Sequence, residues 1–118
     1  TYTLQDGAEV MRTLLVLPAA QRPTALLAVN DPVAVGAAHV AIGAGLRIPA
    51  DLSLVGFDDI PLAAAFSPAL TTVTHRYDEL AALVLEATFQ AIRGEVSHFD
   101  LEPQLIVRGS TAPPLGWP

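Results

Sequence analysis

The chain of 118 residues contains no cysteine and no lysine, and each absence removes whole classes of function. Without cysteine there is no disulfide, no thiol nucleophile and no cysteine-ligated zinc, and a reducing compartment is allowed. Without lysine there is no phosphate-binding loop ending in Gly-Lys-Ser/Thr and no Schiff-base chemistry. A phospho-receiver domain, which normally keeps a lysine near its aspartate, is disfavoured for the same reason.

Clustered positive charge and long apolar runs are also missing. The six basic residues are all arginines, they are scattered along the chain, and the net charge is −6. Contact with a nucleic-acid backbone needs clustered basic side chains, so this segment is not expected to touch DNA itself. Although 52% of the residues are hydrophobic, polar residues, glycine and proline interrupt every apolar run before the ~18 residues of a membrane span. The first residues lack a signal-peptide pattern and an initiator methionine, which indicates an excerpt or a processed piece.

What is present is an alternation of apolar patterns that predicts an α/β fold with a parallel, doubly wound, Rossmann-like sheet. Strands are expected at 24–29, 52–57, 71–74 and 104–108, and helices at about 7–17, 31–43 and 78–93, with a short helical turn from Pro61. The run 24–29 is apolar on both faces, which is typical of a parallel strand covered on both sides. Strand, helix and strand in succession predict a right-handed βαβ unit.

The helix ends carry recognisable capping residues. Asp6 followed by Glu9 is expected to cap the first helix, Asp31 before Pro32 the second, and Asp78 the last. Small residues in the second helix predict close packing against a neighbour.

Two of the predicted strands end in carboxylate-bearing turns. The run 24–29 stops at Asn30-Asp31, and the run 52–57 stops at Asp58-Asp59. The carboxyl ends of parallel strands lie on one edge of an open α/β sheet, where ligands bind. An amide such as that of Asn30 can donate and accept, and a carboxylate such as that of Asp58 can bind two hydroxyl groups of a sugar. The same aspartates are also common cap and turn residues.

Catalytic and metal sites are weakly supported by the sequence. Asp58, Asp59 and His75 could hold a metal, but their spacing matches no known ligand pattern, and His39 and His98 have no partner at metal spacing. The GAGLRI run lacks the third glycine of a dinucleotide fingerprint, and no Gly-x-Ser-x-Gly motif is present. We therefore expect no catalytic residue, no metal and no cofactor.

Three segments closely resemble the lactose-repressor/galactose-repressor family of bacterial transcription regulators. They are TALLAVNDPVAVGA (24–37), GLRIPADLSLVGFDDIPLAAAFSPALTTV (45–73) and RGST (108–111). The resemblance implies a type I periplasmic-binding-protein-like fold, of which residues 1–111 would be the C-terminal part of the effector-binding and dimerisation domain. That part comprises the second lobe and the helix 78–93, which packs on a first lobe outside this chain. Residues 112–118 form a proline-rich tail.

The resemblance also assigns roles by position. Asn30 and Asp58 match residues that contact the effector, and Tyr2 falls where an aromatic residue often stacks on it. His75 matches a cleft position often occupied by glutamine, and Tyr77 matches an aromatic residue at the lobe crossing.

Two further positions, Val35 and Phe66, match the family's dimer surface. The implied function is sensing of a small effector, a sugar or related polyhydroxyl compound, by a cytoplasmic homodimer that contacts DNA through a helix-turn-helix head outside this chain, with no membrane contact. The alternatives are an extracytoplasmic solute-binding protein of the same fold and an α/β enzyme using Asp58, Asp59 and His75. A helix 78–93 without its first lobe would expose an apolar face, which favours association of the isolated chain.

Overall fold

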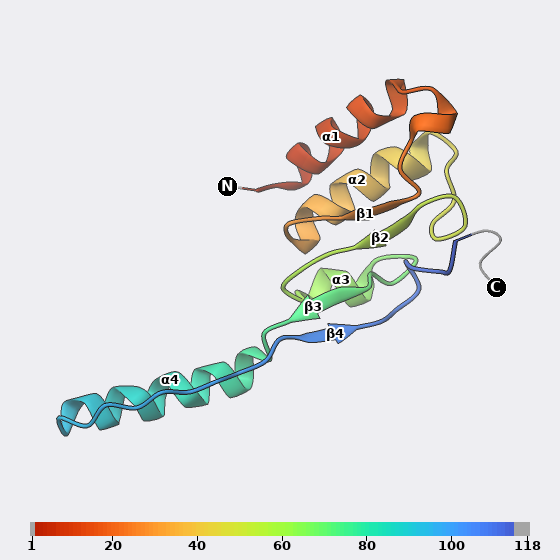
Figure 1. Cartoon of the computed structure of the whole chain (residues 1–118). Coiled ribbons are helices and arrows are strands. Elements are labelled where there is room, and N and C mark those ends of the chain that lie inside the picture. The colour runs from red at the N-terminus through yellow and green to blue at the C-terminus, as the bar shows by residue number, and fades with distance from the viewer. Residues whose placement is uncertain (1, 115–118) are drawn as a thin grey trace.

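The computed structural model describes residues 2–114 and has alternating helices and strands (Figure 1). The elements in chain order are α1 (Leu4–Val16), the 3₁₀ turn η1 (Ala19–Gln21), β1 (Ala25–Leu27), α2 (Asp31–Gly43), β2 (Ser53–Val55), α3 (Pro61–Ala65), β3 (Thr72–Thr74), α4 (Tyr77–Ile92) and β4 (Gln104–Ile106). Every predicted helix and strand is present, and each strand is shorter than expected: β1 and β2 at both ends, β3 at its start and β4 at its end. Thr1 and residues 115–118 of the predicted tail lie outside the described residues.

The strands follow the spatial order β1, β2, β3, β4. β1 pairs with β2 in parallel, with Leu26 opposite Leu54, as the βαβ pattern predicts. A single parallel bridge between Val55 and Thr71 places the start of β3 next to β2. β4 pairs with β3 in the antiparallel direction, so the last strand departs from the all-parallel expectation.

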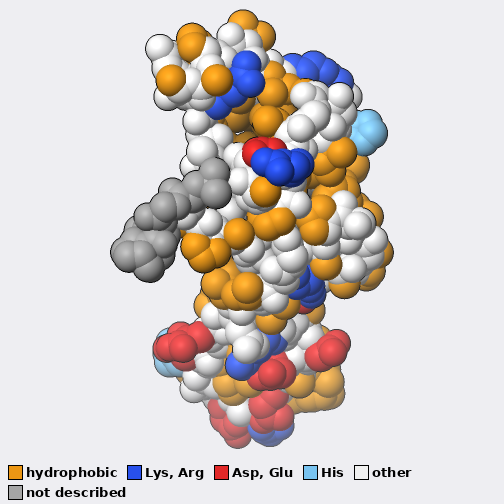
Figure 2. Space-filling view, turned by 90° about the vertical axis from the view of Figure 1, so that its right-hand side faces the viewer, with side chains coloured by type: hydrophobic (Ala, Val, Ile, Leu, Met, Phe, Trp, Pro, Cys, Tyr) orange, Lys and Arg blue, Asp and Glu red, His pale blue; other side chains and the backbone are white. Residues whose placement is uncertain are grey.

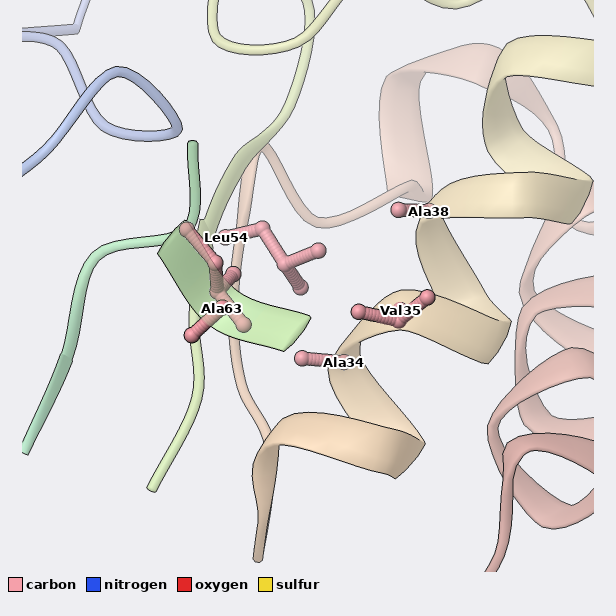
Figure 3. Close-up of a cluster of buried hydrophobic side chains, with 6 residues drawn as sticks. Ala34, Val35, Ala38, Leu54 and Ala63 are labelled. Atoms are coloured by element: carbon pink, nitrogen blue, oxygen red, sulfur yellow. The ribbon is translucent and has the colours of Figure 1, made fainter. Parts of the chain in front are cut away.

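The core lies between the strands and one layer of helices. Ala34, Val35 and Ala38 of α2 pack against Leu54 of β2 and Ala63 of α3 (Figure 3). The opposite face of β1 has no such cover among the described residues, since Leu27 remains 77% exposed. The expectation that β1 is covered on both faces is therefore wrong for this chain.

The two N-terminal helices approach each other unusually closely. A Cβ atom on Gly36 of α2 would lie 1.9 Å from the carbonyl oxygen of Leu4, and one on Gly7 of α1 would lie 2.0 Å from that of Val33. Two glycines therefore let the helix backbones come into contact, which confirms the close packing expected from the small residues of α2.

The helix caps differ from those expected. Thr3, not Asp6, caps α1, and a capping box links Thr3 with Asp6, so the helix begins three residues earlier than predicted. Asn30, not Asp31, caps α2 through a bond from the Val33 amide. α4 follows Arg76, which has a left-handed backbone and makes no side-chain cap, so Asp78 lies in the first turn instead of capping it.

The molecule is extended because α4 projects away from the helix-covered strands (Figure 1). Its radius of gyration is 18.0 Å, whereas a compact chain of this length has a value of roughly 13–14 Å. No residue of α4 is buried. Seen from another side, apolar side chains are exposed along the body and acidic ones gather toward the α4 end (Figure 2). Among residues 2–114, no helix is both long and apolar enough to cross a membrane.

Candidate functional site

The turns that follow β1 and β2 meet at one edge of the strands, as expected. The Asp31 amide donates to the Phe57 carbonyl oxygen at 2.8 Å, and the Asp31 carboxylate accepts from the Ile60 amide at 2.9 Å. The segment carrying Asn30 is therefore bound directly to the segment carrying Asp58.

Asn30 is half-buried, and both ends of its side-chain amide already have partners. Its Oδ1 accepts from the Val33 amide at 2.9 Å, and its Nδ2 donates to the Tyr2 carbonyl oxygen at 3.2 Å. The second bond brings Tyr2, whose side chain is exposed, next to the strand end. An effector contact at Asn30 would use the remaining hydrogen-bonding capacity of this amide.

Asp58 occupies a strained turn. Its φ is 101° and that of Asp59 is 53°, a region that side-chain-bearing residues rarely adopt. The Asp58 amide donates to the Val73 carbonyl oxygen at 2.8 Å, and Asp58 Oδ1 accepts from the Tyr77 hydroxyl at 3.2 Å. The side chain is half-buried, and the Tyr77 bond engages one of its two carboxylate oxygens.

Three aromatic side chains form a row beside Asp58. The Phe57 and His75 rings lie 5.1 Å apart at 66°, and the His75 and Tyr77 rings lie 5.9 Å apart at 65°. Desolvation, followed by the hydrogen bond and negative charge of Asp58, raises the pKa of Tyr77, so its hydroxyl remains a donor at neutral pH. The resemblance predicts His75 at the cleft and Tyr77 at the lobe crossing, and the structure brings the two rings together with Phe57, which the sequence shows only as the residue before Asp58.

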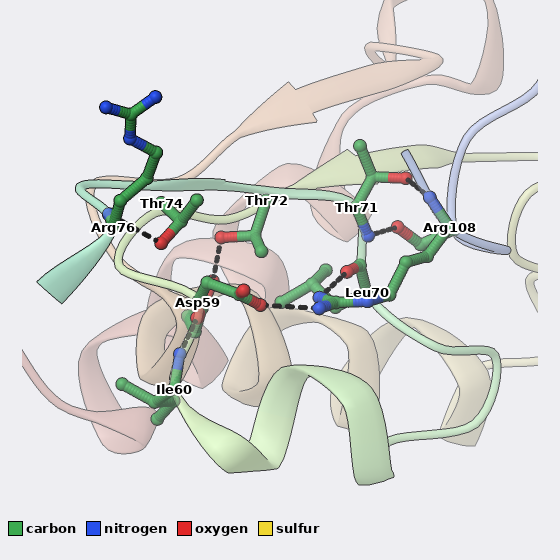
Figure 4. A network of polar contacts seen from close by, with 10 residues as sticks. Asp59, Ile60, Leu70, Thr71, Thr72, Thr74, Arg76 and Arg108 are labelled. Carbon is green, nitrogen blue, oxygen red and sulfur yellow. Dashed lines mark hydrogen bonds and ion pairs between the residues drawn. The ribbon is translucent and has the colours of Figure 1, made fainter. Parts of the chain in front are cut away.

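Asp59 has a different partner. Its carboxylate forms a 2.6 Å ion pair with Arg108, whose guanidinium also donates to the Leu70 carbonyl oxygen (Figure 4). Both side chains of the pair are about four-fifths buried, so Asp59 ties the turn to the segment after β4. No group of three or more metal-ligating residues occurs in the described part of the chain, and the three-residue metal site has no support.

The two residues expected at a dimer surface lie at the core cluster. Val35 is only 7% exposed, and it packs with the helix and strand residues of Figure 3. Phe66, at the end of α3, is half-buried against the same cluster. Phe66 therefore has more side-chain surface left for a second copy than Val35.

Two of the hollows on the described part of the surface bear on the site. The larger, about 560 Å³, lies at the opposite ends of β1 and β2, where Asp51 pairs with Arg47 and the Ser53 hydroxyl bonds the backbone of Ala112. The side chains of Asp51 and Ser53 in this hollow are thus engaged within the chain. The smaller, about 280 Å³, is lined by Thr74, Arg76 and Tyr77 with the two acidic residues that follow, and it adjoins the aromatic row.

The family model for the periplasmic binding protein-like domain matches residues 1–111. The structure of a LacI family transcriptional regulator from Bifidobacterium animalis superimposes with a TM-score of 0.88 at 34% identity, over 96% of this chain and 42% of that one. The chain belongs to the LacI family of transcriptional regulators. Its fold is the periplasmic-binding-protein-like fold of that family, present here as part of a domain.

LacI-family relatives with curated names are transcriptional regulators, not enzymes. The ribose operon repressor of Haemophilus influenzae is 40% identical over 92% of this chain and 33% of its own length. The repressor CytR of Escherichia coli is 39% identical over 93% of this chain and 33% of its own length. A regulator from Lactobacillus casei with bound glucose has a TM-score of 0.82 at 29% identity, over 92% of this chain and 40% of that one. The chain thus spans about a third of the curated relatives that it matches.

Proposed function

We propose that this chain is the effector-sensing and dimerising part of a cytoplasmic transcriptional regulator whose effector is a sugar or a related polyhydroxyl compound. The observation that carries the proposal is Asp58, a half-buried carboxylate at a strand end, held in a strained turn beside an aromatic row. Such a carboxylate accepts hydroxyl groups in charge-assisted bonds, and aromatic rings offer apolar contact to the carbon side of a sugar ring. The glucose-bound relative supports the same ligand class.

The mechanism we propose is a shift between two arrangements of a two-lobed sensor. Asn30, Tyr2, Asp58, His75 and Tyr77 would form one wall of the effector cleft, and the part of the regulator outside this chain would form the other. An effector that contacts both walls favours the closed arrangement, because only that arrangement offers it both sets of contacts. The change in arrangement alters the spacing of the DNA-binding heads, so effector binding and DNA binding are coupled.

We further propose that the regulator is a homodimer through the surface around Phe66 and the N-terminal part of α2. Phe66 is partly buried against the core cluster, so the contact would extend an existing apolar cluster. Val35 would contribute mainly through the buried core cluster against which Phe66 packs.

The proposal is tested by Asp58→Ala in the full-length regulator. Isothermal titration with D-ribose, L-arabinose, D-glucose and sucrose first identifies a sugar that the unsubstituted protein binds. We expect the substitution to weaken that binding roughly 10- to 100-fold, since a hydrogen bond to a charged group contributes about 1.5–3 kcal/mol. Operator affinity without sugar should remain unchanged.

Asp51→Asn is the matched control, because Asp51 is a carboxylate paired with Arg47 at the opposite ends of the strands. It should leave sugar affinity as it was. Equal sugar affinity of the Asp58→Ala and unsubstituted proteins would refute the role of Asp58.

A further inference from the structure

Asp31, the first residue of α2, is a fully buried carboxylate. Its exposed fraction is 0%, and among the described residues no basic side chain lies within ion-pair distance of it. A buried charge without a cation is costly unless hydrogen bonds compensate it. A chain that keeps such a group has a specific use for its hydrogen bonds.

Capping of α2 does not explain Asp31. The capping bond to the Val33 amide comes from Asn30, and Asp31 occupies the first position inside the helix. The positive end of the helix dipole stabilises a carboxylate there, which accounts for how the charge is tolerated. The helix dipole does not account for the two hydrogen-bond donors to the Asp31 carboxylate, because both donors lie outside α2.

Those partners hold the backbone on two sides of Asp58. Asp31 Oδ2 accepts from the Ile60 amide at 2.9 Å, two residues beyond Asp58 in the strained turn. Asp31 Oδ1 accepts from the Thr72 hydroxyl at 2.6 Å, and Thr72 adjoins Val73, whose carbonyl oxygen accepts the Asp58 amide. Gly56 leaves the room that this requires, since a Cβ atom there would lie 2.2 Å from Asp31 Oδ1.

We propose that Asp31 is a positioning residue for the effector site: its buried carboxylate bridges the Ile60 amide and the Thr72 hydroxyl and thereby fixes where the Asp58 carboxylate stands. A residue in a strained conformation keeps it only where its surroundings over-determine it. Asp31 supplies that constraint from α2, as Arg108 supplies another through Asp59. The link between this role and effector binding rests on the proposed function, whereas the fixing of the Asp58 turn by Asp31 does not depend on it.

The test measures, by NMR, the hydrogen-exchange rate of the Asp58 amide in the ligand-free full-length protein and compares this rate between the unsubstituted protein and its variants. The Asp58 amide bonds to Val73 and not to Asp31, so its exchange reports on the turn and not on a lost partner. In Asp31→Ala we expect this exchange to be at least about 10-fold faster, because local opening becomes easier. Asp31→Asn should restore the rate to within about threefold, because its Oδ1 can accept from Ile60 and its Nδ2 can donate to Thr72.

Ser110→Ala is the matched control. Ser110 is as buried as Asp31, but it does not contact the turn. Its replacement by alanine also removes two hydrogen bonds, one from the Thr71 amide and one to the Leu54 carbonyl oxygen. In the Ser110→Ala protein, the Asp58 amide should exchange at the rate of the unsubstituted protein. If Asp31→Ala fails to fold, Thr72→Val keeps the shape, removes one of the two bridges, and should speed the same exchange several-fold.

The positioning role is overturned if the Asp58 amide exchanges no faster in Asp31→Ala than in Ser110→Ala. The same comparison applies to Thr72→Val where that variant replaces Asp31→Ala. Titration with whichever of D-ribose, L-arabinose, D-glucose and sucrose the unsubstituted protein binds adds a second result: Asp31→Ala should bind that sugar at least 10-fold more weakly, and Asp31→Asn about as well as the original protein. If the unsubstituted protein binds no sugar, the proposed effector class fails, while the exchange rates still decide on Asp31.

Discussion

Asp58 shows at the scale of one residue how this chain keeps a carboxylate in a strained backbone position. A positive φ at a residue with a side chain costs of the order of 1–3 kcal/mol, and glycine avoids most of that cost. The chain nevertheless has aspartate at φ 101° and again at 53° in the next position. Contacts from α2, β3, α4 and the segment after β4 hold this turn. Glycine would avoid this strain but would lose the carboxylate, which agrees with the effector-binding role that we propose for Asp58.

Asp58→Gly and Asp58→Ala separate these two contributions. Both remove the carboxylate and its bond from Tyr77, but only glycine relieves the positive φ. We expect the glycine variant to be more stable than the alanine variant by about 1 kcal/mol, with sugar binding weakened to the same extent in both. Urea unfolding of the full-length protein measures the difference. Equal midpoints, or a less stable glycine variant, would show that the turn is not strained.

At the scale of elements, local patterns predict which segments form helices and strands better than they predict the contacts between distant segments. The βαβ pattern placed Asn30 and Asp58 at one edge correctly, because parallel strand ends must coincide there. The sequence predicts the wrong cap for α2, since either of two adjacent polar residues, Asn30 or Asp31, can cap the helix, and only the fold decides between them. The Asp59–Arg108 pair spans 49 residues and has no local pattern at all.

The contact between α1 and α2 gives a prediction at the same scale. In Gly36→Ala the new methyl group would meet the Leu4 carbonyl oxygen, and the helices would have to separate. We expect a loss of about 1–3 kcal/mol in the free energy of unfolding, despite the better helix propensity of alanine. Gly43→Ala in the same helix is the control, because a Cβ atom there meets nothing within 4 Å. It should be neutral or stabilising by up to about 1 kcal/mol in urea unfolding, and similar losses in both variants would contradict tight packing.

At the scale of the whole molecule, the projecting α4 presents an apolar stripe without a partner among the described residues. Leu85, Phe89 and Ile92 follow each other at spacings of four and three, which places them on one face of the helix, and they are 58%, 52% and 75% exposed. The uncovered face of β1 adds Leu27. Apolar surface of this kind is typical of a contact with another part of a larger assembly, which is what we propose for α4. The chain spans only about a third of its curated relatives, which supports the same conclusion.

The apolar stripe predicts opposite effects of one double substitution in two settings. In the 118-residue chain made alone, we expect association and poorly cooperative unfolding, and Leu85→Gln with Phe89→Gln should reduce that association because it removes exposed apolar surface. In the full-length regulator the same pair should destabilise the protein by several kcal/mol, since side chains buried against the rest of the sensor are lost. Light scattering and urea unfolding measure the two effects. A monomeric isolated chain with a sharp two-state transition, or a full-length protein indifferent to the substitutions, would mean that α4 needs no partner.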